Sequence, residues 1–362
     1  MITEKAPGKL YIAGEYAVLE QDCPAILVAV DQFVRVSISP SRNGRGLIYS
    51  KQYSQSAVHW TRQGEKMVID NRDNPFEYIL AAIAYTERYC LEQQVKMRVY
   101  DLNVNSDLDS ADGKKFGLGS SAAVTVATVK AILHFYGVRV SNELIYKLSA
   151  ISHYSVQGNG SAGDIAASVY GGWIAYQTFD KRWIKRELAI KSLSEVVSEA
   201  WVGLNIQLLT PPASLKLLIG WSQHPASTSQ LVDEMNANKE QMETQYEAFL
   251  RDSRACVRQM IRGFLNQDIR LIQRQIRTNR LLLQHFARTN HIAIEIPRLT
   301  NLITIAERYA GAAKTSGAGN GDCGIVIADN QAKVHELKEE WQANGILPLN
   351  FHVHSIPLMS EG

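Results

Sequence analysis

The residues with the clearest chemical potential lie in the stretch FGLGSSAAV, residues 116–124. Two glycines flank Leu118, and two serines precede a run of small residues that favour a helix. Glycine lets a loop bring its backbone N–H groups close to a ligand, because it has no Cβ to clash. A helix that follows points its own unpaired N–H groups at the same place. The stretch therefore predicts a phosphate-binding loop or, as the simpler alternative, an ordinary loop-to-helix junction capped by a serine.

Three other segments carry residues of the kind that bind or transfer phosphate. PGKLYIAGEY, residues 7–16, contains Lys9, and GSAGD, residues 160–164, ends at Asp164. KTSGAGNGD, residues 314–322, is a further glycine-rich loop. The sequence contains neither the GxxxxGK[ST] pattern of a P-loop nor a GxGxxG fingerprint after its first predicted strand. These two nucleotide-binding classes are therefore excluded.

The surrounding pattern predicts the elements that position these segments. Alternating or continuous apolar runs indicate strands, and apolar residues at helical spacing indicate helices. Strands are expected at 10–13, 25–30, 33–39, 47–49, 58–60, 66–69, 97–102, 173–176, 215–220, 323–328 and 351–356. Helices are expected from Asn74-Pro75 onward and at 121–136, 141–157, 229–265, 268–289, 297–310 and 331–344, and residues 103–115 are expected to form a long polar loop.

Composition narrows the class of protein. Basic and acidic side chains nearly balance, 38 against 36, so net charge favours neither nucleic acid nor a membrane as a partner. The four cysteines show no CxxC spacing and predict neither a zinc site nor a disulfide framework. The N-terminal residues lack the apolar core of a signal peptide, and no apolar run is long enough to span a bilayer. We expect a cytoplasmic globular protein, either a monomer or a homodimer.

The glycine-rich stretches, taken in their order along the chain, resemble the motifs of the GHMP kinases, a family that includes galactokinase, homoserine kinase, mevalonate kinase and phosphomevalonate kinase. The resemblance spans nearly the whole chain. It implies an α+β fold of two domains: an N-terminal domain with a left-handed βαβ crossover, and a ferredoxin-like C-terminal domain. The active site would lie between them. The pattern that indicates helices and strands weakens within 179–199, where charged residues cluster. We therefore predict a boundary in this segment, with domains at 1–190 and 191–362.

The resemblance also assigns roles to individual residues. Lys9 and Asp164 match the family's lysine and catalytic aspartate, although alone they could be a surface lysine and a helix cap. Ser121 matches the serine that binds Mg²⁺. The third motif, Ser316, Gly317 and Ala318, would close over the transferred phosphate and the substrate. The ATP phosphates would be wrapped by Gly117, Leu118, Gly119, Ser120 and Ser121.

One position departs from the family pattern. Relatives such as mevalonate kinase carry a metal-binding glutamate eleven residues before the catalytic aspartate, and here that position is His153. A neutral imidazole is a poor ligand for Mg²⁺, which prefers hard oxygen donors. We therefore expect the metal to be held mainly by nucleotide phosphates, Ser121 and water, and His153 to be a packed helix residue.

Further features resemble the branch that phosphorylates an already phosphorylated acceptor, the phosphomevalonate kinases. Lys114 and Lys115 precede the second motif, as a lysine does in that branch. Gly220-Trp221-Ser222 and Ala226-Ser227-Thr228 match a GWS…AST pattern. Acceptor-binding residues implied by this resemblance are Lys115, Ser161, Tyr16, Ala17, Ser222, Ser316, Gly317 and Ala318. For Tyr16 a buried side chain with a satisfied hydroxyl is an equal alternative.

Electrostatics agrees with a phosphorylated acceptor. Two anionic phosphates must come within bonding range, and cations such as Lys9, Lys115 and Mg²⁺ would offset their repulsion. A phosphomonoester has a second pKa of about 6, so the attacking oxygen is largely ionised at neutral pH. Asp164 is then expected to position Lys9 and the acceptor rather than to act as a strong base.

These observations predict an enzyme that converts 5-phosphomevalonate and ATP into 5-diphosphomevalonate and ADP, with Mg²⁺ as cofactor. The alternatives are another GHMP kinase, acting on mevalonate or homoserine, and the related diphosphomevalonate decarboxylase. A protein with the same fold but without activity is a third class. The intact Lys9, Ser121 and Asp164 argue against that last class.

Overall fold

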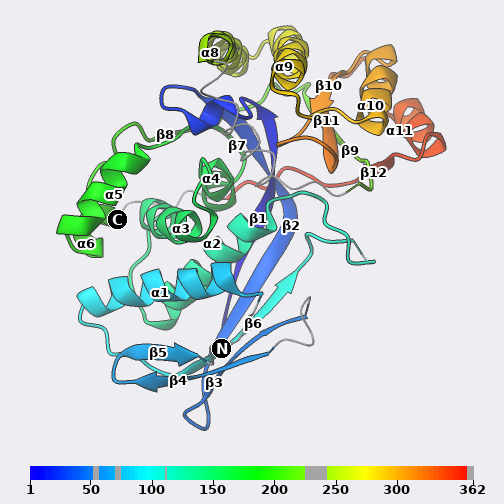
Figure 1. Cartoon of the computed structure of the whole chain (residues 1–362). Coiled ribbons are helices and arrows are strands. Elements are labelled where there is room, and N and C mark those ends of the chain that lie inside the picture. The colour runs from blue at the N-terminus through cyan, green and yellow to red at the C-terminus, as the bar shows by residue number, and fades with distance from the viewer. Residues whose placement is uncertain (52–56, 70–74, 111, 225–242, 357–362) are drawn as a thin grey trace.

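The computed structural model describes residues 1–51, 57–69, 75–110, 112–224 and 243–356. It is a two-domain α+β fold with two β-sheets, each covered by helices (Figure 1). The larger sheet has the strand order β5-β4-β3-β6-β2-β7-β8, and β1 pairs with β2 beside this path. The smaller sheet has the order β10-β11-β9-β12. The α+β class predicted from the sequence is therefore confirmed.

Strands β1 (Ile2–Ala13) and β2 (Ala25–Pro40) form the long antiparallel pair at the centre of the molecule. Two separate strands were expected at 25–30 and 33–39, and this prediction was wrong because β2 is continuous. Its pairing register shifts instead, since Pro7 lies opposite Phe33 and the next residue, Gly8, lies opposite Val30. Asp31 and Gln32, which lie between Val30 and Phe33, interrupt the apolar pattern without ending the strand.

Strand β6 (Tyr100–Ser106) extends four residues into the segment that was expected to be loop. Its asparagines give the segment a polar composition, but Leu102 and Val104 are buried in the core and the alternation is that of a half-buried strand. Four further strands of this sheet match or extend predicted ones: β3 (Gly46–Ser50), β4 (Val58–Gln63), β5 (Lys66–Ile69) and β7 (Trp173–Gln177). Strand β8 (Asn205–Leu209) was not predicted.

Four helices pack against the larger sheet or on one another beside it: α1 (Glu77–Glu92), α2 (Ser120–Phe135), α3 (Asn142–Gln157) and α4 (Gly163–Tyr170). Ser141 caps α3 as predicted, because its side chain accepts the N–H of Leu144. Helix α1 starts at Glu77, two residues after Pro75, and the predicted cap Asn74 lies outside the described residues. A short 3-10 turn (Ala17–Leu19) follows the β1 strand.

The smaller sheet combines β9 (Lys216–Trp221) and β10 (Ala312–Thr315) with β11 (Cys323–Ala328) and β12 (Leu347–Leu349). The helices in this part of the chain are α8 (Glu243–Leu265), α9 (Ile269–Asn290), α10 (Pro297–Arg308) and α11 (Val334–Ala343). Helices α10 and α11 share one apolar cluster with this sheet, which includes Leu302, Val326 and Trp341. The part of the predicted helix at 229–242 lies outside the described residues.

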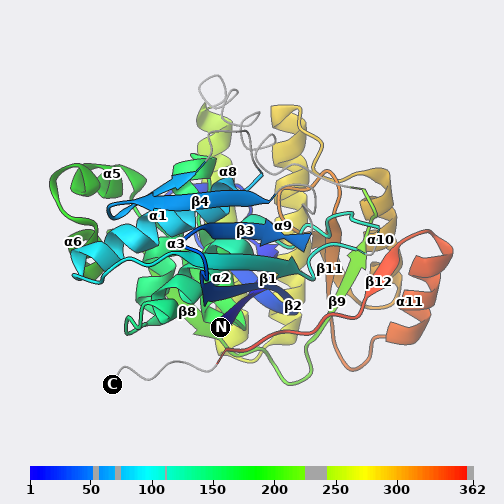
Figure 2. The ribbon, with the colours of Figure 1, turned by 90° about the horizontal axis from the view of Figure 1, so that it is seen from below.

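The last strand was predicted at 351–356, and this was wrong. Strand β12 precedes that segment, and residues 350–356 pass back to the larger sheet instead (Figure 2). They make isolated bridges from Val353 to Val30 and from Ser355 to Gly171. The alternation of apolar and polar residues in this tail therefore belongs to an extended segment that bridges to the larger sheet. It does not mark a strand of the smaller sheet.

The segment between the sheets contains α5 (Lys181–Ile190), α6 (Leu193–Ser198) and then β8, which pairs with β7 of the larger sheet. The predicted domain division at 190 and 191 remains a prediction. None of the helices in the described ranges is both long and apolar enough to cross a bilayer.

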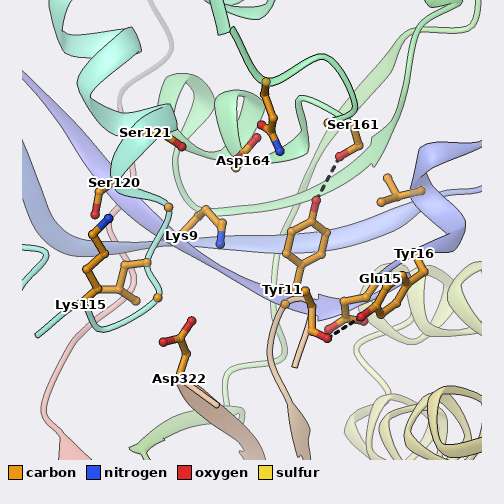
Figure 3. Close-up of a pocket in the computed structure, with 18 of the residues that line it drawn as sticks. Lys9, Tyr11, Glu15, Tyr16, Lys115, Ser120, Ser121, Ser161, Asp164 and Asp322 are labelled. Atoms are coloured by element: carbon orange, nitrogen blue, oxygen red, sulfur yellow. Dashed lines mark hydrogen bonds between the residues drawn. The ribbon is translucent and has the colours of Figure 1, made fainter. Parts of the chain in front are cut away.

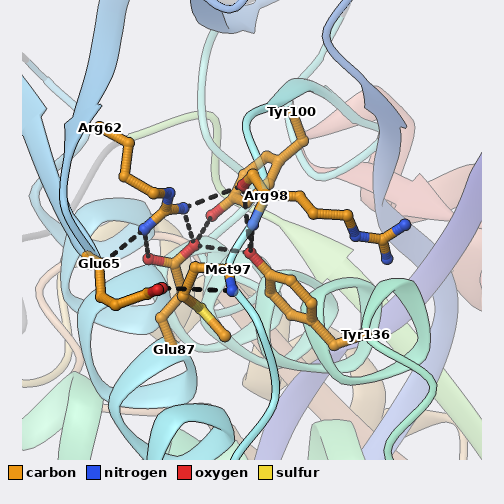
Figure 4. A network of polar contacts seen from close by, with 7 residues as sticks. All are labelled: Arg62, Glu65, Glu87, Met97, Arg98, Tyr100 and Tyr136. Carbon is orange, nitrogen blue, oxygen red and sulfur yellow. Dashed lines mark hydrogen bonds and ion pairs between the residues drawn. The ribbon is translucent and has the colours of Figure 1, made fainter.

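A buried polar network fastens the β4–β5 hairpin to the helical layer (Figure 4). Arg62 forms a bidentate ion pair with Glu87 of α1, in which the two guanidinium nitrogens lie 2.7 and 3.0 Å from the two carboxylate oxygens. The hydroxyls of Tyr100 and Tyr136 donate to the same carboxylate at 3.0 and 3.1 Å. Burial raises the pKa of Tyr100, and the charge of Glu87 raises it further. The network therefore keeps both tyrosines neutral and Glu87 fully hydrogen-bonded.

Candidate active site

A cavity of about 480 Å³ opens between β1, the start of α2, the start of α4 and the loop after β10 (Figure 3). The sequence-predicted residues that line it come from all four segments, which lie far apart in the chain. They are Lys9, Tyr16, Lys115, Gly117, Leu118, Gly119, Ser120, Ser121, Ser161, Asp164, Gly317 and Ala318.

Three predicted residues are not among the described residues that line this cavity. Ala17 is fully buried in an apolar cluster with Phe249 and Phe286. Ser222 is also fully buried, and its backbone N–H donates to the carbonyl of Asp322 at 2.9 Å. The Ser316 hydroxyl accepts the N–H of Tyr11 and donates to the carbonyl of that residue, both at 2.9 Å. All three therefore lie behind the lining and support it. The predicted AST triplet at 226–228 lies outside the described residues.

The glycine stretch forms an open anion site at the N-terminus of α2. Gly117 and Gly119 have φ angles of 79° and 76°, a left-handed conformation that other residues rarely adopt. Gly119 is the N-cap residue of α2 and no side chain caps the helix. The serine-capped junction considered from the sequence is therefore not what forms. The first N–H groups of α2 have no helical partner and lie beside the cavity, where they favour a negative charge.

Strand β1 brings Lys9 against this loop. The backbone N–H of Lys9 donates to the carbonyl of Leu118 at 2.9 Å. A Cβ on Gly119 would lie 2.9 Å from Cε of Lys9, so a larger residue there would displace the end of that side chain in addition to holding a strained φ. Lys9 is 8% exposed, and Tyr11, two residues later on the same face of the strand, also lines the cavity.

Replacing Gly117 by alanine is expected to weaken binding of the ATP analogue AMPPNP by about 10- to 100-fold, because a displaced loop loses a backbone hydrogen bond to a charged phosphate, which contributes about 1.5–3 kcal/mol. The new Cβ would lie 2.4 Å from the carboxylate of Asp322, and the residue would also hold a strained φ. Isothermal titration of AMPPNP measures the effect. Gly137→Ala is the matched control, since Gly137 has a φ of 69° and a Cβ added there would meet no atom within 4 Å. Equal effects of the two changes would show that backbone strain alone is responsible.

The loop before α4 holds Ser161, and the first turn of α4 holds Asp164, at the opposite wall. The Ser161 carbonyl accepts from the hydroxyls of Tyr176 and Thr178, at 2.5 and 2.9 Å. Its own hydroxyl lies 3.1 Å from that of Tyr11. Asp164 is in the first turn of α4, where the helix dipole stabilises a carboxylate. Burial raises the pKa of Tyr11 and the charge of Asp164 adds to this, so the tyrosine stays protonated.

A third set of contacts ties the elbow after β1 to the loop after β10. Lys314 is fully buried and forms an ion pair with Glu15, whose side chain is 2% exposed. The Tyr16 hydroxyl donates to the carbonyl of Ala318 at 2.6 Å. Tyr16 has a φ of 62°, in the left-handed region that residues other than glycine seldom adopt. The floor of the cavity is therefore built from two segments that are joined by a buried charge pair and a hydrogen bond.

Sequence reasoning did not assign every lining residue to the site, and Tyr11, Glu15, Tyr78 and Asp322 are among those it missed. Tyr11 could have been found, because strand periodicity puts it on the same face as Lys9. Glu15 and Asp322 lie inside the quoted motifs, but nothing in the sequence says that they face a cavity. Tyr78 comes from α1, which contains none of the motifs.

His153 lies directly behind Ser121. Its Nε2 is 3.1 Å from the Ser121 hydroxyl, and its ring stacks on Tyr78 with the centroids 4.8 Å apart. His153 is 2% exposed, and burial lowers its pKa although Asp164 acts in the opposite direction. It is thus a buried helix residue, as expected from the sequence.

A second cavity of about 800 Å³ adjoins the first and shares Tyr78, Lys115, Ser120 and Ser121 with it. It extends between the start of α1, strand β6 and the loop that follows β6. Val34, Ile79, Val104 and Val124 give it apolar walls, and Ser50, Asn105 and Ser106 add polar groups. Its size and mixed lining suit the base and ribose of a nucleotide.

The protein groups fit a magnesium ion that is held chiefly by a nucleotide. The described residues contain no cluster of three or more His, Cys, Asp or Glu side chains able to hold a metal by themselves. Ser121 and Asp164 nevertheless supply oxygen atoms to the same cavity. Mg²⁺ at nucleotide sites commonly uses one or two protein oxygens, substrate phosphates and water.

Comparisons with known proteins agree with this geometry. Residues 77–172 match the model of the GHMP kinases N terminal domain, and residues 260–347 match that of the GHMP kinases C terminal region. A phosphomevalonate kinase of Streptomyces sp. (strain CL190) is 34% identical, with 96% of each chain covered. A Listeria innocua protein of known structure is 35% identical, with 99% of each chain covered and a TM-score of 0.92.

A second solved structure, Streptococcus pneumoniae phosphomevalonate kinase in complex with phosphomevalonate and AMPPNP, is 30% identical. The match covers 98% of this chain and 100% of that one, with a TM-score of 0.85. Both halves of the fold and the order of the motifs are therefore those of one family. The chain belongs to the GHMP kinase family.

Proposed function

We propose that this kinase transfers the γ-phosphoryl group of ATP to the phosphate of (R)-5-phosphomevalonate, which gives (R)-5-diphosphomevalonate and ADP in isoprenoid biosynthesis. The observation that carries the proposal is the convergence of Lys9, Lys115 and the open N-terminus of α2 on one cavity. Such a site suits two phosphate groups that must approach each other. The similarity to phosphomevalonate kinases supports the same choice of acceptor.

In this proposal the ATP phosphates bind along Gly117 to Ser121, and the nucleoside occupies the second cavity. Ser121, together with the nucleotide phosphates, would hold Mg²⁺, and the bound ion would supply positive charge against the charge that develops during transfer. The acceptor lies toward the floor of the first cavity, beside Tyr16, Ser161, Gly317 and Ala318. Ala17, Ser222 and Ser316 support this floor from behind.

The chemical step is an in-line substitution at phosphorus. A phosphate oxygen of the acceptor forms a bond to the γ-phosphorus, and the bond to the oxygen that bridges the β and γ phosphates breaks, so ADP leaves. Because the attacking oxygen is already ionised at neutral pH, no strong base is needed. Lys9 stabilises the charge on the transferred group, and Asp164 positions Lys9 and the acceptor.

The second candidate is a GHMP kinase for an unphosphorylated alcohol such as mevalonate or homoserine. Lys115 favours the phosphorylated acceptor, because the hydroxyl group that mevalonate or homoserine would present for transfer carries no charge for this cation to pair with. ADP release measured with mevalonate, phosphomevalonate, homoserine and galactose separates the candidates. Turnover of phosphomevalonate alone is expected, and turnover of an alcohol alone would contradict the proposal.

Replacing Lys115 by methionine is expected to raise the KM for phosphomevalonate about tenfold and to change the KM for ATP much less, since one charge-assisted contact is lost. Lys114→Met is the matched control, because Lys114 is exposed and pairs with Asp112 at 3.1 Å. Steady-state kinetics with each substrate varied in turn measures both constants. Equal increases for ATP and acceptor would contradict the assignment of Lys115 to the acceptor phosphate.

We place the enzyme in the cytoplasm, as a monomer or homodimer that needs neither nucleic acid nor a membrane. Four free cysteines, all buried, are consistent with a reducing compartment.

A further inference from the structure

We propose that His153 is a positioning residue that holds the Ser121 hydroxyl in the orientation needed to bind the metal–nucleotide complex, so that this kinase binds the metal without a carboxylate at that position. The proposal rests on the nucleotide site described above, because it takes Ser121 to lie at the metal. It does not depend on which acceptor is phosphorylated.

The first observation is the contact between the two side chains. Ser121 is in the first turn of α2 and His153 is in the last turns of α3, and Nε2 of the imidazole lies 3.1 Å from the hydroxyl oxygen. A serine hydroxyl rotates freely unless a partner fixes it, and this contact supplies that partner. The hydroxyl can then keep a lone pair directed toward the cavity.

The second observation is the place of the imidazole relative to the cavities. Among the described residues, Ser121 lines both cavities and His153 lines neither. The ring is 2% exposed and covered by Tyr78, which stacks on it with an interplanar angle of 29°. His153 therefore reaches the ligand site through Ser121 and is not placed to bind a metal ion itself.

The third argument is electrostatic. A carboxylate at this position would add a negative charge beside a site that must hold the triphosphate of ATP and the phosphate of the acceptor. An imidazole that fixes a neutral hydroxyl keeps one metal-binding oxygen without that charge. Residues that orient a metal-binding group typically change metal affinity by 10–100-fold when they are lost.

The test is a double-mutant cycle on Mn²⁺ binding to the full-length protein in the presence of AMPPNP, with free Mn²⁺ measured by electron paramagnetic resonance. His153→Phe keeps the stacked ring and removes the nitrogen. It is expected to weaken Mn²⁺ binding by at least about tenfold. His153→Gln, which returns a polar group near the position of Nε2, is expected to restore most of the affinity.

In the Ser121→Ala background, His153→Phe is expected to have almost no further effect, because the residue acts through the missing hydroxyl. Full additivity of the two changes would overturn the proposal and indicate independent roles. Unchanged Mn²⁺ affinity in His153→Phe would overturn it as well. If the phenylalanine variant does not fold, His153→Leu takes its place in the same cycle.

This cycle is separable from the test of the acceptor. AMPPNP and Mn²⁺ bind without phosphomevalonate, so an incorrect acceptor would leave the cycle unaffected. An incorrect role for His153 would likewise leave the product of the reaction unchanged.

Discussion

Replacing Lys9 by methionine is expected to lower kcat by about 10³-fold while AMPPNP affinity changes only a few-fold, since in the proposed mechanism the lysine contributes mainly in the transition state. Its side chain is 8% exposed and lies against Gly119 at the start of α2. It is thus a cation held in place before the substrates arrive, and it needs little reorganisation when charge moves to the transferred phosphoryl group. Methionine has a similar shape and buries readily, so the fold is expected to persist.

Single-turnover kinetics with saturating ATP and phosphomevalonate separates this effect from product release. Lys5→Met is the control, because Lys5 lies four residues earlier on the same strand and is exposed. It is expected to leave kcat within about twofold, as exposed charges at a distance are largely screened. If Lys9→Met raised only the KM values and left kcat intact, the role assigned to Lys9 in transfer would be wrong.

The second large effect concerns stability. Arg62→Met is expected to lower the free energy of unfolding by about 3–5 kcal/mol, because it leaves the carboxylate of Glu87 buried without its charged partner. The side chains of the pair are only 7% and 6% exposed, so water cannot replace the lost contacts. The two tyrosine hydroxyls would still donate to Glu87, which keeps the loss within this range.

Denaturant unfolding followed by circular dichroism measures the change. Arg88→Ala is the matched control, since Arg88 pairs with Glu92 on the same helix but is 47% exposed, and such pairs contribute less than about 1 kcal/mol. The double variant Arg62→Met/Glu87→Gln is expected to recover part of the loss. Equal costs for Arg62→Met and Arg88→Ala would contradict the importance of burial at this network.

The sequence was most informative where local chemistry decides the structure. The glycines at 117 and 119 predicted a loop that opens onto a helix, and that is how α2 begins. The Ser141 cap and the α3 helix followed from local signals as well. The α+β class and the GHMP fold followed from the motifs in their order, which the comparisons confirm.

The sequence was least informative where distant segments decide the structure. The continuity of β2 is accompanied by a register shift in its pairing with β1, which no local pattern reveals. The tail at 350–356 returns to the larger sheet because it finds bridging partners at Val30 and Gly171. The ion pair between Glu15 and Lys314 joins residues 299 positions apart, so a lining role for Glu15 could not be inferred from either motif alone.

The proposed reaction yields a diphosphate, because the phosphoryl group is transferred to an acceptor that already carries phosphate. Phosphorus NMR of a reaction containing the full-length protein, Mg²⁺, ATP and 5-phosphomevalonate tests this directly. The expected result is the loss of the phosphomonoester signal and the growth of two coupled diphosphate signals in addition to those of ADP. A phosphomonoester signal that persists here, together with phosphorylation of mevalonate or homoserine in parallel reactions with the same enzyme, would contradict the proposed function.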